Sequence, residues 1–155
     1  MSKIYYLMGK SSTGKDTIYK ELRKRMPQLK NVTIYTTRPR REGEKEGEEY
    51  FFTDEIELEK FKTEGRLIEE RAYNTVYGVW YYFTADDGQF NFEQKDQDYL
   101  MIGTLESYEK LKTYFGNEKV VPLYIEVEDG ERLTRALARE KTQKEPKYAE
   151  MCRRF

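Results

Sequence analysis

The chain has 155 residues, enough for one domain with a sizeable buried core. Its 28 Lys and Arg residues against 29 Asp and Glu residues give a net charge of −1, which excludes bulk electrostatic attraction to polymeric nucleic acid or to a membrane surface. It has no histidine and a single cysteine, Cys152, which excludes histidine-dependent nucleophilic catalysis, histidine-ligated zinc and an internal disulfide.

Strand-like and helix-like segments alternate along the chain. Apolar runs of strand length fall at residues 4–8, 32–35, 99–103 and 120–127, and charged stretches of helical length fall at 16–25, 55–62, 105–114, 130–141 and 146–155. Pro146 suits the first turn of the last helix, because that position needs no backbone N–H. The alternation predicts an α/β fold around a parallel central sheet.

Residues 48–83 carry a different pattern. The runs at 50–52, 76–77 and 79–83 are short, aromatic and β-branched, which favours strands over helices. They predict a small antiparallel β insert on the α/β frame. We therefore expect a single domain over residues 1–155, with a core at 1–33 and 84–130, an insert at about 34–83 and a C-terminal region at about 131–155.

The first chemical motif follows the first expected strand. Residues 9–17 read Gly-Lys-Ser-Ser-Thr-Gly-Lys-Asp-Thr and stand directly before a helical pattern. Glycine at both ends of such a loop lets backbone N–H groups converge on phosphate oxygens, and the following helix directs its positive end at the same point. The alternative is a plain strand-to-helix turn, which does not require this order of glycines and lysine. We predict an ATP phosphate site at Gly9, Ser11, Ser12, Thr13, Gly14, Lys15, Asp16 and Thr17.

A second motif occupies residues 36–52. Thr36-Thr37-Arg38 is followed by Arg41, then by Gly43-Glu44 and by a Gly-x-x-Tyr-x-Phe pattern that ends at Phe52. Guanidinium groups give planar, bidentate and permanently charged recognition of phosphate oxygens, although a basic stretch alone is as often a solvated turn. Together with the phosphate loop upstream, this motif resembles the acceptor signature of the guanylate kinase family.

The resemblance covers nearly the whole chain and implies a three-layer P-loop fold, with helices on both faces of the parallel sheet and an acceptor-binding β insert. It implies an enzyme that transfers the γ-phosphate of ATP to GMP or dGMP, with Mg²⁺ as cofactor and small nucleotides as partners. In that family two arginines and a tyrosine hold the acceptor phosphate and a glutamate reads guanine. Acceptor binding would accordingly fall to Arg38, Arg41, Glu44, Tyr50, Glu69, Tyr77 and Gly78.

The guanine-reading positions depart from the family pattern. Ile34 stands where Ser is usual, Val79 stands where Ser or Thr is common, and Gly103 ends a strand that is usually rich in Asp. Losing these polar partners removes hydrogen bonds that discriminate between bases. Glu69, which is one residue nearer to Tyr77 than usual, is either the acceptor of the guanine N–H groups or an exposed strand glutamate.

The magnesium site departs from the usual loop as well. Asp16 takes the place of the hydroxyl residue that normally follows the lysine, and the hydroxyl comes one residue later at Thr17. Several nucleoside-monophosphate kinases share this order, so we expect Mg²⁺ ligation by Thr17 and Asp16, direct or through water. Asp16 could instead cap the helix, and Thr104 or Glu106 could replace the missing strand-end carboxylates.

Arginines gather near the C-terminus. Arg132, Arg135 and Arg139 share one face of the helix expected over 130–141, and the resemblance implies that arginines here and in the next helix, Arg153 and Arg154, form a lid over ATP. Such groups stabilise the charge of the phosphoryl group in transfer. A solvated face that pairs with glutamates is the alternative for any one of them. The candidate catalytic residues are Lys15, Arg38, Arg135 and Arg139.

Two other functions stay open at this stage. One is a binding module of the same family that has lost catalysis and holds phosphorylated peptides; the intact Lys15 argues against it. The other is a P-loop kinase for a different phosphorylated acceptor. The lone thiol and the absence of any run of about 20 apolar residues predict a cytoplasmic protein with no membrane partner. Because family members usually continue past the point that corresponds to Phe155, either a final element lies outside this sequence or the chain is a shortened member.

Overall fold

The computed structural model describes residues 1–94 and 96–155 and contains a parallel core sheet. The sheet has the order β2-β7-β1-β8. Its strands are β1 (Ile4–Gly9), β2 (Lys30–Asn31), β7 (Tyr99–Ile102) and β8 (Val120–Ile125). Every neighbouring pair in it is parallel, which confirms the α/β fold expected from the alternating pattern.

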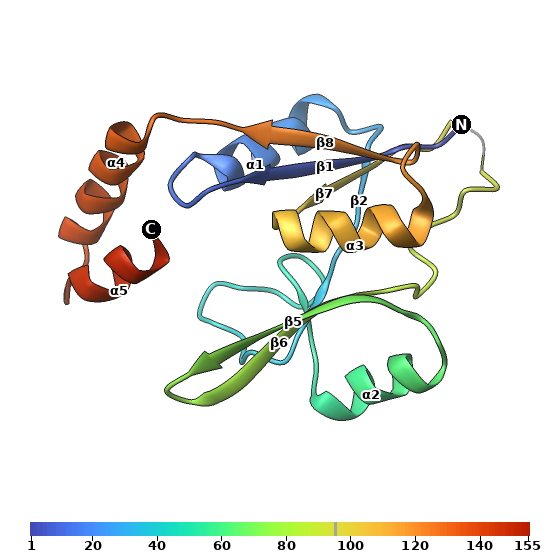
Figure 1. The fold of residues 1–155 in the computed structure, drawn as a ribbon, viewed down its shortest axis with the longest axis horizontal. Coiled ribbons are helices and arrows are strands. Elements are labelled where there is room, and N and C mark those ends of the chain that lie inside the picture. The colour runs from blue at the N-terminus through green and yellow to red at the C-terminus, as the bar shows by residue number, and fades with distance from the viewer. Residues whose placement is uncertain (95) are drawn as a thin grey trace.

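Helices cover both faces of the core sheet. Helix α3 (Leu105–Phe115) packs on one face, where Leu111 joins Ile4, Tyr6 and other apolar side chains in the main core. Helix α1 (Lys15–Arg25) follows β1 on the other face, where its Leu22 lines a groove together with Tyr5. The assignment follows from the strands, in which successive side chains point to opposite faces. In Figure 1, α3 lies between the core sheet and the β5–β6 hairpin.

A second sheet has the order β4-β3-β6-β5. Its strands are β3 (Tyr35–Thr36), β4 (Phe51–Phe52), β5 (Leu67–Thr75) and β6 (Gly78–Ala85). The β5–β6 and β3–β6 pairs are antiparallel, but β3 and β4 are parallel. The expectation of a wholly antiparallel insert is therefore wrong at one pair, because the long connection between β3 and β4 returns the chain in the same direction.

The second sheet has an aromatic core of its own. Tyr35 stacks on Phe83 with ring centroids 4.9 Å apart, and its hydroxyl donates to Asp87 Oδ2 at 2.6 Å. Helix α2 (Glu55–Thr63) adds Leu58 and Phe61 to the same cluster. A separate core of this kind lets the insert keep its shape while it presents one edge to the core sheet.

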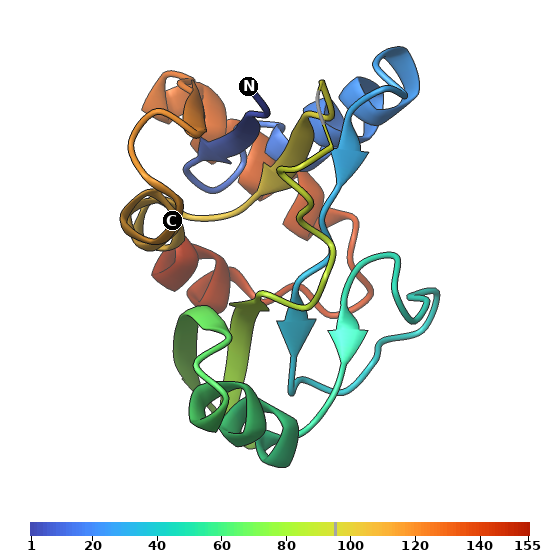
Figure 2. The ribbon, with the colours of Figure 1, turned by 90° about the vertical axis from the view of Figure 1, so that its right-hand side faces the viewer.

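The strand expected over residues 32–35 is wrong in its bounds: the chain splits into two short strands, with residues 32–34 between them and only Tyr35 of the expected run in a strand. β2 ends at Asn31, and the segment 32–34 crosses to β3 beside the returning segment that follows β6 (Figure 2). The side chain of Gln89 takes the place of a strand partner, since it accepts from Thr33 N at 2.8 Å and donates to Thr33 O at 2.8 Å. The split satisfies the backbone at the crossing and separates the sheets enough to leave a cleft between them.

The C-terminal helices lie at the end of the core sheet where β1 and β8 finish (Figure 1). They are α4 (Asp129–Lys141) and α5 (Tyr148–Arg154). Pro146 precedes α5 by two residues, so the helix expected from residue 146 begins later than predicted; Lys147 N instead donates to Glu140 Oε1 at 2.7 Å, which fixes the start of α5 against α4. In the described part of the chain, no helix combines the length and the apolar character needed to span a bilayer.

Candidate active site

The phosphate loop joins β1 to α1. A Cβ added at Gly9 would lie 2.8 Å from Thr13 Oγ1 and 3.0 Å from Ile125 O, so only glycine lets the loop pack against the end of β8. Gly14 has a φ of 84° and caps α1, a left-handed conformation that favours glycine. Both glycines of the motif are therefore explained by local geometry. Thr13 Oγ1 closes the loop with a bond to Lys10 O at 3.0 Å.

Two arginines of α4 contact this loop. Arg132 Nη1 donates to Ser11 O at 3.0 Å, and Arg139 Nη2 donates to Ser12 Oγ at 2.7 Å. Arg132 is only 3% exposed and its guanidinium lies 4.2 Å from the centroid of the Phe155 ring. The sequence analysis placed Arg132 on this helix face but did not include it among the site residues. Arg132 is buried whereas Arg135 and Arg139 are exposed, and this difference results from the packing of α4.

Arg135 lies apart from the loop contacts. It is exposed, and its Nη2 pairs with Glu131 Oε1 at 2.6 Å. This is the solvated pairing that was the alternative for a lid arginine. Its contribution to a lid remains a prediction.

A cleft of about 890 Å³ lies between the core sheet and the second sheet. Its walls come from the start of α1, the loop between β3 and β4, the β5–β6 hairpin and α5. It collects six of the residues predicted from the sequence, namely Lys15, Asp16, Arg41, Tyr50, Arg153 and Arg154. Residues up to 139 positions apart in sequence thus line one space, and most of the charged ones are cationic.

The acceptor loop is held in place by its two threonines. Thr36 Oγ1 donates to Tyr81 O at 2.9 Å and accepts from Arg38 N at 3.1 Å. Thr37 Oγ1 accepts from Tyr81 N at 2.9 Å. The Thr-Thr-Arg sequence therefore anchors the loop to β6, which orients the residues that follow it toward the cleft.

Arg38 does not line the cleft; it holds the loop that carries Arg41. It is 4% exposed, and its Nη1 and Nη2 each lie 2.8 Å from a carboxylate oxygen of Glu44. The bonded guanidinium lowers the pKa of Glu44 to about 2, and Glu44 in turn holds the pKa of Arg38 above its usual value. Glu44 also accepts from Arg41 N at 2.7 Å, so the buried pair fixes the backbone that carries Arg41.

Glu69 is neither an exposed strand residue nor a wall of the cleft. Its side chain is fully buried and accepts from Thr84 Oγ1 at 2.8 Å and from Arg71 Nε at 3.2 Å. The alternative of an exposed glutamate is therefore wrong. The predicted contact between Glu69 and a base remains a prediction, although both carboxylate oxygens already have protein donors.

Tyr77 and Gly78 form the tip of the β5–β6 hairpin. Tyr77 is 82% exposed and stacks on Trp80, with centroids 6.1 Å apart, and Gly78 takes a φ of 108° at the turn. Neither residue lines the cleft in this arrangement. Their contact with an acceptor stays a prediction.

Arg71 is the residue of the cleft that the sequence analysis missed. It lies in β5, two positions after Glu69 and so on the same face of the strand. The spacing of opposite charges at i and i+2 in a strand was the available signal. It was not decisive, because such pairs are common on solvated strands.

The guanylate kinase family model matches residues 1–151 of this sequence. The chain belongs to the guanylate kinase family. A guanylate kinase of Thermobifida fusca (strain YX) is 42% identical over 67 residues, which are 43% of this chain and 34% of that protein. A guanylate kinase of Gloeobacter violaceus (strain ATCC 29082 / PCC 7421) is 40% identical over 80 residues, which are 51% of this chain and 39% of that protein.

A solved member of the guanylate kinase family has a similar fold. The crystal structure of guanylate kinase from Anaplasma phagocytophilum superposes with a TM-score of 0.63 at 25% identity, covering 88% of this chain and 65% of that one. The two curated matches above cover less than two fifths of the relatives' length, and the structural match covers about two thirds. The comparisons thus establish family and fold for this chain.

The donor set for a metal is small in this member of the guanylate kinase family. Among the described residues, no cluster of three or more His, Cys, Asp and Glu side chains is arranged to hold a metal ion. Asp16 lines the cleft, whereas Thr17 is exposed outside it and Thr104 Oγ1 accepts from Ser107 N at 3.2 Å in a helix cap. Mg²⁺ is commonly bound by one or two carboxylates together with substrate phosphates and water, so a single carboxylate beside the loop fits it.

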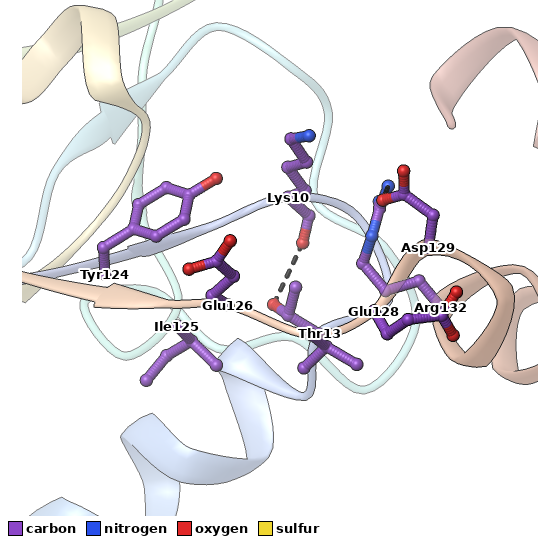
Figure 3. Close-up of a pocket in the computed structure, with 9 residues that line it drawn as sticks. Lys10, Thr13, Tyr124, Ile125, Glu126, Glu128, Asp129 and Arg132 are labelled. Atoms are coloured by element: carbon purple, nitrogen blue, oxygen red, sulfur yellow. Dashed lines mark hydrogen bonds and ion pairs between the residues drawn. The ribbon is translucent and has the colours of Figure 1, made fainter.

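A second, smaller pocket of about 450 Å³ adjoins the outer side of the phosphate loop. Figure 3 shows Tyr124 and Glu126 from the end of β8 near Lys10, with Asp129 and Arg132 across from them. This pocket takes Lys10 and Thr13 from the loop, whereas the larger cleft takes Lys15 and Asp16 from the start of α1.

Proposed function

We propose that this chain transfers the γ-phosphate of ATP to GMP or dGMP, which yields ADP and the corresponding diphosphate. The observation that carries the proposal is the shared cleft, in which Lys15 from the phosphate loop, Arg41 from the acceptor loop and Arg153 from α5 line one space. Phosphoryl transfer requires that two phosphates be aligned and that charge on the moving group be neutralised. It does not require histidine, which this chain lacks.

In the proposed mechanism, ATP lies with its phosphates on the backbone N–H groups of the loop and the first turn of α1, and Lys15 contacts the β- and γ-phosphates. The acceptor phosphate lies between Arg41 and Tyr50. Arg38 and Glu44 act through these residues, because their buried pair fixes the loop. The two phosphates then meet in line above the start of α1.

When bound, Mg²⁺ would supply positive charge that offsets the negative charge of the ATP phosphates. Of this chain's residues, Asp16 offers a carboxylate on the wall of the cleft, and Thr17 offers a hydroxyl that would act directly or through water. Mg²⁺ is commonly bound by one or two carboxylates together with substrate phosphates, so these residues would hold it jointly with ATP.

The arginines of α4 and α5 are the proposed lid. Arg153 is bonded to Glu150 at 2.9 and 2.6 Å, and both residues line the cleft. An incoming phosphate would therefore compete with Glu150 for this guanidinium. Arg139 already contacts the phosphate loop, and Arg135 and Arg154 complete the proposed set. The cytoplasm, where ATP is abundant, is the proposed site of action, and the single thiol of Cys152 suits a reducing compartment.

A coupled assay of ADP release tests the proposal. The chain is supplied with ATP and Mg²⁺ and with GMP, dGMP, AMP, CMP or UMP in turn, and we expect ADP release that depends on GMP or dGMP. Lys15→Met should lower it by about 10²–10³-fold, whereas Arg25→Met, at an exposed position of α1, should not. ADP release that is unaffected by any monophosphate would contradict the proposal.

A further inference from the structure

Arg71 is a nearly buried arginine on the floor of the cleft, and the mechanism above leaves it unused. It is 9% exposed and lines the cleft together with Ile34 and Gly103. These are two of the positions at which the family pattern led us to expect polar groups that read the base. A cation therefore stands where these polar readers are missing.

The guanidinium of Arg71 is oriented by Glu69. Its Nε and Nη2 point to Glu69 Oε2 and Oε1 at 3.2 and 3.5 Å, and Thr84 Oγ1 donates to the same Oε1 at 2.8 Å. The side-on edge of the guanidinium is thus engaged with the carboxylate. Within residues 1–94 and 96–155, Nη1 makes no hydrogen bond, so the end-on edge formed by Nη1 and Nη2 keeps free N–H donors.

Aromatic side chains surround this edge. The Arg71 guanidinium lies 5.8 Å from the centroid of the Tyr82 ring, and Tyr73 meets Tyr82 edge to face at 5.6 Å. Tyr73, Trp80 and Tyr82 all line the cleft. Such rings form a surface on which a flat heterocycle can stack, which places the edge of the heterocycle against the arginine.

Guanine and adenine differ at the edge that such an arginine contacts. Guanine presents two adjacent acceptors, O6 and N7, and arginine binds them with two parallel N–H groups, whereas adenine presents one acceptor and an amino donor. The Arg71–Glu69 pair has no net charge, which favours an uncharged base over a second phosphate as its ligand.

We propose that Arg71 selects guanine over adenine in this cleft by donating from Nη1 and Nη2 to O6 and N7 of the base. Glu69 is then a positioning residue that holds the guanidinium and does not contact the base. This inference rests on the proposed nucleotide-kinase function and deepens it, because it assigns base selection to a residue outside the family motif.

The assignment can be tested on the wild-type chain by comparing nucleotides that differ at the base. IMP has the same O6 and N7 as GMP but lacks the 2-amino group, so it should bind within about threefold of GMP if Arg71 reads the base. 7-Deaza-GMP lacks the N7 acceptor and should bind more weakly than GMP. AMP should bind about 5- to 150-fold more weakly than GMP, the range of one bidentate contact.

Binding is measured by the fluorescence of Trp80, the only tryptophan of the chain, which lines the cleft. The full chain is titrated with GMP, IMP, 7-deaza-GMP and AMP, as wild type and as Arg71→Lys, Arg71→Met and the control Arg25→Met. Both Arg71 variants should bring the GMP-to-AMP affinity ratio toward one, since lysine keeps the charge but loses the planar pair of donors. The control should keep the ratio. Circular dichroism identifies any variant that fails to fold.

Three outcomes would overturn the inference. In wild type, IMP at least tenfold weaker than GMP with 7-deaza-GMP equal to GMP would assign the reading to the N1 and N2 edge. In folded Arg71 variants, an unchanged GMP-to-AMP ratio would remove the role of Arg71, and if GMP is still phosphorylated the proposed function would survive. If no monophosphate alters Trp80 fluorescence or ADP release, the proposed function and this inference fail together.

Discussion

The two phosphate sites proposed for this chain are built in different ways. The donor site is a loop of nine consecutive residues whose shape depends on backbone conformation, with Gly14 at a positive φ and Gly9 at a close contact with β8. The acceptor site is a cleft whose cations come from the loop after β3, from β5 and from α5. A local loop carries its binding geometry within its own sequence, whereas the cleft exists only if two sheets and a C-terminal helix pack together.

The arginines around the cleft differ from one another in how they are paired. Arg38 and Arg71 are buried against Glu44 and Glu69, while Arg153 is bonded to Glu150 at the surface. A buried pair is costly to break on one side, but an exposed pair exchanges partners at little cost. The buried pairs therefore shape the cleft, with Arg71 also lining it, whereas Arg153 at the surface can exchange Glu150 for a ligand.

The largest effect is expected from breaking the Arg38–Glu44 pair. Arg38→Ala leaves Glu44 without its partner and should lower the free energy of unfolding by about 3–5 kcal/mol. It should weaken GMP binding strongly, because Arg41 and Tyr50 lose their support, while ATP binding changes little. Denaturant unfolding and calorimetric titration with each nucleotide measure this. Lys45→Ala, at an exposed cationic position of the same loop, is the control; equal loss of both nucleotides would mean that the two sites are not separately built.

Lys15→Met tests the donor side of the comparison. The loss of one cation that contacts the transferred phosphoryl group should lower kcat by about 10²–10³-fold. GMP affinity, measured through Trp80 fluorescence, should stay within about threefold, because Arg41 and Tyr50 remain. Unchanged kcat would remove Lys15 from the reaction.

Gly9→Ala tests whether the loop is as self-contained as its sequence suggests. The new Cβ would clash with Thr13 Oγ1 and with the backbone oxygen of Ile125, so the free energy of unfolding should fall by about 1–3 kcal/mol. ATP affinity should fall as well, since the loop must move off β8. Thermal unfolding beside Lys24→Ala, an exposed change in α1, measures the difference. A variant as stable as wild type would show that the contact with β8 is dispensable.

The pH dependence of stability gives a smaller effect. Pairing with Arg38 lowers the pKa of Glu44 from 4.5 to about 2. A lowered carboxyl pKa contributes stability above pH 4.5 that is lost as the pH falls toward 2. The difference in unfolding free energy between wild type and Glu44→Gln should therefore shrink over this range, by an amount on the order of 1–2 kcal/mol. A difference that is constant with pH would contradict the pairing.

The smallest effect is expected at the exposed pair. Glu150→Gln releases Arg153 from a surface ion pair, and such pairs contribute little to stability because solvent screens them. ATP should bind up to about fivefold more tightly if Arg153 meets a phosphate. Calorimetric titration measures this, with Glu21→Gln on α1, which pairs with Arg25 at 2.8 Å, as the control. Weaker binding would indicate that Glu150 itself supports the site.

Much of the fold could be predicted from the sequence because its signals are local. The parallel core follows from alternating apolar and amphipathic segments, and the phosphate loop follows from two glycines and a lysine between a strand and a helix. The acceptor motif also brought Arg41 and Tyr50 forward, and both line the cleft. Each motif lies in one continuous stretch of sequence, and the alternation compares neighbouring segments.

Only the tertiary structure decided what depends on distant partners. Residues 32–34, expected in a strand, form the crossing between the sheets, where Gln89, more than fifty residues away, bonds to Thr33. Arg71 becomes a floor of the cleft, and Arg132 a contact of the phosphate loop, because strand and helix packing bury them beside groups far off in sequence. The sequence states which side chains are cationic, but burial and orientation, which decide whether a cation shapes a site or meets a ligand, arise only when the sheets pack.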